Sequence, residues 1–189
     1  MKSKNIRFPS LLKSKKNQKG YSIVSVMLGI LVGGIMLVVA VYQFQDSTKK
    51  TRIETATQEI LQIISTSQKN YGFANQYGQV TTAIAVQGGI VPEARRNAGT
   101  NTANNNYNGA ITFAPATINS TNDGLAITYA NVRGGDCQQL IQNTESLTRQ
   151  VFVGTTQVKT TDSPVTLAAL STACDAASTV AVKWVIGRS

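Results

Sequence analysis

The stretch YSIVSVMLGILVGGIMLVVAVYQFQ occupies residues 21–45 and contains no charged side chain. As an α-helix, 25 residues span about 37 Å, and the hydrocarbon core of a bilayer is about 30 Å thick. A cleaved secretory signal has a shorter apolar region of about 7–15 residues, followed by a site of small residues. The sequence VAVYQFQD at residues 39–46 fits such a site poorly. We therefore expect a retained membrane-spanning helix.

The positive charge of the chain is concentrated before this helix. The protein has 189 residues and a net charge of +9, and residues 1–20 hold seven of its 18 lysines and arginines and no acid. The other residues hold 11 basic and nine acidic side chains, a net charge of +2. A basic stretch that abuts an apolar span keeps that end cytoplasmic. Direct nucleic-acid binding is not expected, because the body lacks a basic face with interleaved aromatic residues.

After residue 45 the helix is predicted to continue with a single apolar face. Apolar and small side chains recur there at intervals of three and four residues: Ile53, Ala56, Ile60, Ile64, Ser67 and Tyr71. Charged residues, including Arg52 and Glu59, lie mostly off this stripe. We interpret the stripe as the face that packs on the core of a domain.

The rest of the chain reads as a mixture of short helices and strands. Short helices are expected near 79–87, from 136 with Asp136 as the N-cap, and before residue 174 with Asp162 or Ser163 as the N-cap. Strands are expected at 124–132, 149–154, 156–160 and 178–187. An apolar run at 110–114 is expected to be ordered. Residues 97–109 are rich in asparagine and are expected to form a loop, with disorder as the alternative.

The two cysteines, Cys137 and Cys174, allow two interpretations. If the body is exported, an oxidising compartment lets them pair. In a cytosolic protein they would be two buried free thiols. They do not predict a zinc site, because the sequence has no histidine and no CxxC motif.

No catalytic constellation is evident in the sequence. Without histidine there is no triad or imidazole proton shuttle, and no glycine-rich phosphate loop is present. Only a Ser–Lys dyad, which any serine and lysine could form in the fold, stays open. We expect neither an enzyme nor a cofactor or metal site.

The boundary Lys19-Gly20-Tyr21 resembles the class III signal of type IV prepilins, in which a basic leader ends at a glycine before a long apolar helix. The resemblance implies that a prepilin peptidase cuts after Gly20, on the cytoplasmic side, and usually methylates the new amine of Tyr21. The 20-residue leader, the sequence CQQLI after a strand, and a second cysteine before a C-terminal strand resemble the type IVb subclass in particular.

This resemblance implies an α+β fold, in which a long N-terminal helix packs on an antiparallel β-sheet. It divides the chain into a cleaved leader (1–20), a long helix (21–71, with 21–45 spanning the membrane or forming the filament core) and a globular head (72–189). It also implies a disulfide between Cys137 and Cys174 that encloses a segment called the D-region.

The implied partners are copies of the same chain in a helical filament, other pilins, the peptidase and an inner-membrane assembly platform. The implied location is the inner membrane of a Gram-negative bacterium before assembly and an extracellular pilus afterwards. The resemblance leaves adhesion, conjugation, secretion and motility open as uses of the pilus.

Several positions within the apolar helix predict specific roles. Family members usually have glutamate at the fifth mature position, where it is thought to neutralise the N-terminal amine of a neighbouring subunit, but this chain has Ser25. Gly29 and Gly33 form a GxxxG spacing, which allows close helix approach. Gly33-Gly34 is a weak point of the helix and the candidate for the locally unwound segment found in type IV filaments.

Three other readings stay open beside a major pilin. The first is a minor or tip pilin, or a pseudopilin of a related secretion or conjugation system. The second is a bitopic periplasmic binding protein that keeps an uncleaved anchor. The third is a secreted enzyme, whose mature chain would begin after residue 41.

Overall fold

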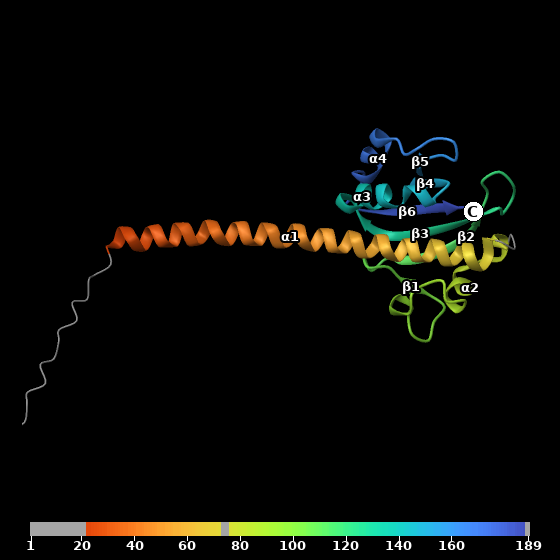
Figure 1. The fold of residues 1–189 in the computed structure, drawn as a ribbon, viewed down its shortest axis with the longest axis horizontal. Coiled ribbons are helices and arrows are strands. Elements are labelled where there is room, and N and C mark those ends of the chain that lie inside the picture. The colour runs from red at the N-terminus through yellow and green to blue at the C-terminus, as the bar shows by residue number, and fades with distance from the viewer. Residues whose placement is uncertain (1–21, 73–75, 188–189) are drawn as a thin grey trace, which may run out of the picture. The chain divides into compact units, whose positions relative to one another are not determined.

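The computed structural model describes residues 22–72 and 76–187. Its elements, in chain order, are α1 Ile23–Ser67, the π-helical turn η1 Gln68–Gly72, η2 Tyr77–Gln79, α2 Thr82–Gln87, η3 Glu93–Arg95, β1 Ala103–Asn104, β2 Ala110–Ala116, β3 Gly124–Arg133, α3 Gly134–Thr144, η4 Glu145–Leu147, β4 Gln150–Val153, β5 Thr156–Lys159, α4 Leu167–Cys174 and β6 Thr179–Ile186 (Figure 1). The chain divides into two compact units, Met1–Phe44 and Gln45–Ser189. We call the second unit the head.

The head is built on one antiparallel sheet of six strands in the order β1-β2-β3-β6-β4-β5. The C-terminal strand β6 lies in the middle and pairs with β3 on one side and β4 on the other, with Ile127 opposite Trp184 and Val151 opposite the same tryptophan. The strands at 124–133, 150–153, 156–159 and 179–186 confirm the four predicted from the sequence, and the apolar run at 110–114 lies in β2.

The part of α1 that belongs to the head packs on this sheet (Figure 1). The stripe predicted from the sequence is confirmed there: Ile53, Ala56, Ile60 and Ile64 are at most 1% exposed. They join the apolar side chains of the sheet in one core around the Trp184 and Tyr129 rings, whose centroids lie 5.4 Å apart in an edge-to-face arrangement. The structure is therefore the α+β fold that the resemblance implies.

The asparagine-rich segment 97–109 is ordered, so the alternative of disorder is wrong. Asn105, 2% exposed, accepts hydrogen bonds from the backbone N–H groups of Tyr107 and Gly109 and donates to the carbonyl of Ala130. Asn108 takes the left-handed conformation with φ 58°, which asparagine tolerates better than most residues. One buried amide thus closes the tight connection between β1 and β2.

Two predicted helix caps are wrong. Asp136 lies inside the first turn of α3, and its side chain caps no backbone group because it binds Arg52 instead. Neither Asp162 nor Ser163 caps α4, which starts later, after Thr166. Ser163 instead forms an isolated bridge with Thr160, and the Glu145 carboxylate accepts from the N–H of Val165, so the segment before α4 stays extended.

Candidate functional site

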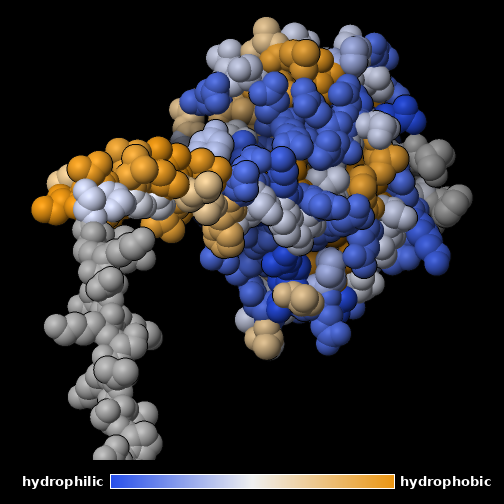
Figure 2. Space-filling model, turned by 60° about the vertical axis from the view of Figure 1, so that its left-hand side comes forward, coloured by the Kyte–Doolittle hydropathy of each residue, from blue (hydrophilic) through white to orange (hydrophobic). Residues whose placement is uncertain are grey.

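The largest exposed apolar surface on the described residues is the first half of α1. Every residue of Ile23–Phe44 is exposed, and this segment carries sixteen of the exposed large apolar side chains, from Ile23 at 75% to Phe44 at 73%. Figure 2 shows the apolar colouring concentrated on this helix, whereas polar residues prevail on the visible face of the head. We call Ile23–Phe44 the apolar segment.

The apolar segment has no polar face. A helix that is apolar all round is buried in a protein core or in a membrane, and among the described residues α1 is the one helix long and apolar enough to cross a bilayer. Removing a large apolar side chain from water contributes about 1.5–3 kcal/mol. For this set of side chains the total is on the order of tens of kcal/mol, so the segment needs an apolar environment.

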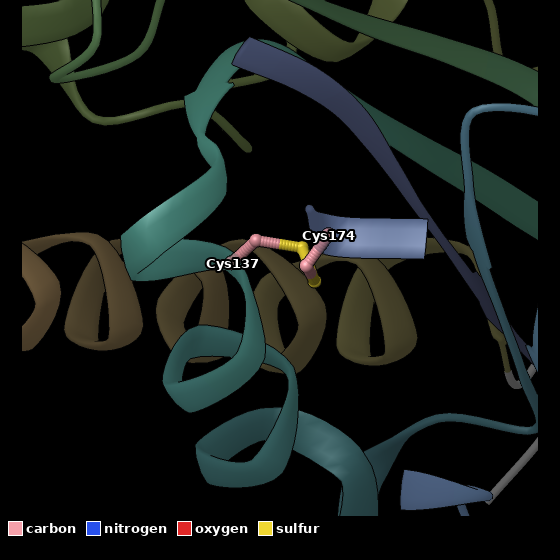
Figure 3. Close-up of a disulfide and its surroundings, with 2 residues drawn as sticks. All are labelled: Cys137 and Cys174. Atoms are coloured by element: carbon pink, nitrogen blue, oxygen red, sulfur yellow. A yellow bond between two sulfur atoms is a disulfide. The ribbon is translucent and has the colours of Figure 1, made fainter. Parts of the chain in front are cut away.

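The disulfide Cys137–Cys174 joins the start of α3 to the end of α4 (Figure 3). The two Cα atoms lie 5.7 Å apart, and both cysteines are at most 1% exposed. Next to the bond, a side chain on Gly134 would collide with the carbonyl oxygens of Cys174 and Ala177, so only glycine fits where α3 begins. The bridge encloses residues 137–174, which include β4, β5 and α4.

A polar cluster ties α1 to the start of the enclosed segment. Nε of Arg52 lies 2.7 Å from Oδ2 of Asp136, whose side chain is 3% exposed. The guanidinium also lies over the ring of Tyr107, 5.8 Å from its centroid, and the amide of Asn106 donates to the carbonyl of Arg52. Hydrogen bonding to Asp136 raises the pKa of Arg52, so this cation is permanent.

A second buried cluster is centred on Glu59. Its side chain is 5% exposed and accepts from Nε of Arg95 at 2.6 Å and from the hydroxyl of Tyr129 at 2.6 Å. Burial, reinforced by the Glu59 carboxylate, raises the pKa of Tyr129 well above its usual value. Tyr129 is therefore a proton donor to Glu59 at neutral pH. The two clusters fix the position of α1 relative to β3 and to the segment that precedes the sheet.

Neither cluster has the features of a catalytic or metal centre. Among the described residues no group of three or more Asp, Glu, Cys or His side chains could hold a metal ion. The charged groups in both clusters are committed to one another in pairs, and Asp136 and Glu59 are buried. Their arrangement holds the head together.

A family model described as PilS N terminal matches residues 50–187, more than half of the chain. The chain belongs to this family of type IV pilins. A pilin is a structural protein, and both family and fold are those of structural proteins rather than enzymes.

Solved structures share the fold of this pilin. The crystal structure of a type IVb pilin from Salmonella typhi matches 72% of this chain and 99% of its own, with 19% identity and a TM-score of 0.54. The crystal structure of TcpA, a type IV pilin from Vibrio cholerae El Tor biotype, matches 71% of this chain and 98% of its own, with 15% identity and a TM-score of 0.52. No curated protein sequence matches the chain. The pilin therefore has the type IVb pilin fold.

The residues singled out from the sequence lie in separate parts of the pilin. Gly20 and Tyr21 lie outside the described residues. Ser25 is exposed, and its hydroxyl donates to the carbonyl of Ser22 at 2.7 Å. Gly29, Gly33 and Gly34 lie in unbroken helix, where an added Cβ would meet no neighbouring atom outside the helix backbone. The cysteine pair forms the disulfide that the resemblance implied.

Sequence reasoning missed the two polar clusters. Glu59 was expected off the buried stripe, but it is 6% exposed, which is a correction. A signal was present, because Glu59 stands three residues after Ala56 and four before Ile63, and so shares their face of the helix. Asp136 and Arg52 gave no such signal, because 84 residues separate them.

Proposed function

We propose that this pilin is the structural subunit of a type IVb pilus, cleaved after Gly20 and polymerised through its apolar segment. The observation that carries the proposal is the pairing of a fully packed head with a helical segment that is apolar on every side and exposed. A segment of this kind in a pilin serves as the surface through which subunits assemble.

The apolar segment would have two successive apolar environments. Before assembly, acyl chains of the inner membrane of a Gram-negative bacterium surround it, and the head lies on the periplasmic side. In the pilus, equivalent helices of neighbouring copies replace the lipid. Both environments remove the same apolar surface from water. If the helix passes directly from the lipid to the filament, no large apolar area is exposed to water.

The domain division follows from this function. Residues 1–20 are a leader removed by prepilin peptidase, 21–71 the long helix with 21–45 as membrane span and filament core, and 72–189 the globular domain with the D-region 137–174. Besides copies of itself and other pilins, the partners are the peptidase and an inner-membrane assembly platform.

Ser25 gives the amine of Tyr21 an unusual neighbour. Its hydroxyl proton is already donated to Ser22, which leaves an oxygen lone pair that can accept from an ammonium group but cannot cancel its charge. An unpaired charge in an apolar filament core is costly. We infer that another group in the filament neutralises this amine.

The intact mass of the protein extracted from membranes tests the processing step. We expect a chain that begins at Tyr21, with or without one methyl group. A chain that retains residues 1–20 would contradict the proposal and favour the bitopic binding protein, and a chain beginning beyond residue 41 would favour a secreted protein.

Quantifying the protein in sheared filaments separates a major from a minor subunit. We propose the major subunit, because residues 45–189 form one compact unit. The chain should then be the most abundant protein of the sheared fraction. A trace amount would instead make it a minor or tip pilin.

A further inference from the structure

The sequence contains one Asn-Gly pair, Asn108-Gly109, which lies in the connection between β1 and β2. The geometry of the connection favours both residue types. Asn108 has a left-handed φ of 58°, which asparagine tolerates better than most residues. A Cβ on Gly109 would collide with the carbonyl oxygen of Ala130, so only glycine fits at this position. The fold therefore places a chemically labile pair in this turn.

The lability of this pair comes from the backbone nitrogen of the glycine, which no side chain shields. In deamidation, the nitrogen of Gly109 bonds to Cγ of Asn108, and the bond from Cγ to Nδ2 breaks. Nδ2 leaves as ammonia, together with the proton that the backbone nitrogen gives up. Water then opens the resulting succinimide at one of its two carbonyls and leaves aspartate or isoaspartate at position 108. The Asn108 side chain is accessible to water, because this residue is exposed.

The attacking nitrogen, in contrast, is buried and engaged. Gly109 is buried, and its N–H donates to Oδ1 of Asn105 at 3.0 Å. In a succinimide, Cγ takes the place of this proton on the planar nitrogen, so the N–H must point at Asn108 before the ring can close. Here it points at Asn105 instead. The carbonyl of Gly109 also accepts from the backbone N–H of Asn105 at 2.8 Å, so rotation of Gly109 towards Asn108 disrupts this pairing.

The Asn105 side chain is itself fixed in place. It is 2% exposed, and its Nδ2 donates to the carbonyl of Ala130 in β3 at 2.8 Å. Its Oδ1 accepts from the N–H of Tyr107 at 2.8 Å as well as from that of Gly109. The bond to β3 determines that the oxygen of this amide, and not its nitrogen, faces the turn.

We propose that Asn108-Gly109 is a latent deamidation site, which Asn105 keeps closed in the folded head. Modification then requires local opening of the connection, in which the N–H of Gly109 leaves Asn105. Isoaspartate at position 108 would add one carbon to the backbone of the turn and prevent the same hydrogen bonds from forming again. The inference concerns the head alone and does not depend on the proposed function.

Peptide mass spectrometry after incubation at mildly alkaline pH tests this assignment. The full-length protein in detergent is compared with the same chain reduced and unfolded in guanidinium chloride, and the deamidated fraction at Asn108 is followed with time. We expect the folded protein to react at least about tenfold more slowly, because two or more hydrogen bonds must open before the attack. The variant N105A should recover most of the rate of the unfolded chain. The control N119A, which removes an exposed asparagine between β2 and β3, should react like the unmodified protein.

Three results would overturn the assignment. Equal rates in the folded and unfolded chains would show that the fold does not protect Asn108. An N105A variant that is folded, as judged by Trp184 fluorescence, and as slow as the unmodified protein would assign the protection to other groups. The third test needs no variant, because the Gly109 amide of the unmodified protein should exchange its hydrogen at least about tenfold more slowly than in the unfolded chain. Exchange at the unfolded rate would contradict the proposal even if N105A does not fold.

Discussion

The two halves of α1 use similar residues for different purposes. Between Ile23 and Phe44 the helix is apolar on every side and exposed. Between Ile53 and Ser67 it is apolar on one face only, and that face is buried in the head. The first half thus depends on surroundings that the single chain does not supply, whereas the second half is complete within its own fold.

This difference separates stability from assembly. Substitutions in the buried half should change the free energy of unfolding of the head, and substitutions in the apolar segment should change membrane insertion or filament formation. The lone tryptophan, Trp184, is fully buried in the head, so its fluorescence follows unfolding of the head without a contribution from the apolar segment.

Removal of the disulfide should have the largest effect on the head. The variant C137A/C174A frees a loop closed across 37 positions, and the loop-entropy relation gives a loss of about 4 kcal/mol. Urea unfolding followed by Trp184 fluorescence measures the loss, with the unmodified protein under reducing conditions as the control. An unchanged midpoint would mean that the bridge does not constrain the unfolded chain.

A matched pair of isoleucines compares the two halves directly. Ile60→Ala removes a fully buried side chain and should cost about 2–5 kcal/mol. Ile35→Ala removes one that is 58% exposed and should leave the unfolding free energy of the head within about 0.5 kcal/mol. Both are measured by urea unfolding in detergent. Equal losses of unfolding free energy at the two sites would contradict the division of α1 into an exposed and a buried half.

Tyr129→Phe tests the buried Glu59 cluster. The variant deprives the carboxylate of one of its two side-chain donors, so the head should lose about 1–3 kcal/mol at neutral pH. A variant as stable as the unmodified protein would show that the hydroxyl is dispensable.

The same variant should change the response to alkali. The pKa of Tyr129 is raised by burial and then by Glu59, so its contribution to stability is complete below the unfolded pKa of about 10 and is lost as pH rises from there towards the folded value. Tyr129→Phe should therefore show a shallower loss of stability above pH 10. An identical alkaline slope would assign that loss to other groups, such as Tyr107, whose pKa burial also raises.

The smallest expected effect concerns Gly33 and Gly34. Replacing both with alanine should strengthen the isolated helix by about 1 kcal/mol at each site, and neither Cβ meets an obstacle. The head should keep its urea midpoint, while the yield of sheared filaments should fall if assembly requires local unwinding there. Gly29→Ala is the control, since it makes one substitution of the same kind one turn earlier in the helix. Equal yields from both variants would remove Gly33-Gly34 as the unwinding site.

Local pattern made most of the fold predictable. The apolar period of α1, the alternating strands and the glycine at residue 154, which turns between β4 and β5 with φ 59°, depend on neighbours within a few residues. The apolar segment was equally predictable, because it is recognised from its amino-acid composition alone.

Long-range partners explain what the sequence did not reveal. Asp136 has the residue type of an N-cap, but its carboxylate forms an ion pair with Arg52 of α1. Glu59 has the residue type of a surface charge, and its partners Arg95 and Tyr129 are distant in the sequence.

The central claim is that copies of this chain replace lipid around the apolar segment. A photo-crosslinking amino acid at Leu31, a side chain 60% exposed in the single chain, tests it most directly in sheared filaments. The account predicts a ladder of covalent pilin dimers and higher multimers after irradiation. Filaments that assemble normally with the probe in place yet yield only monomer would contradict it.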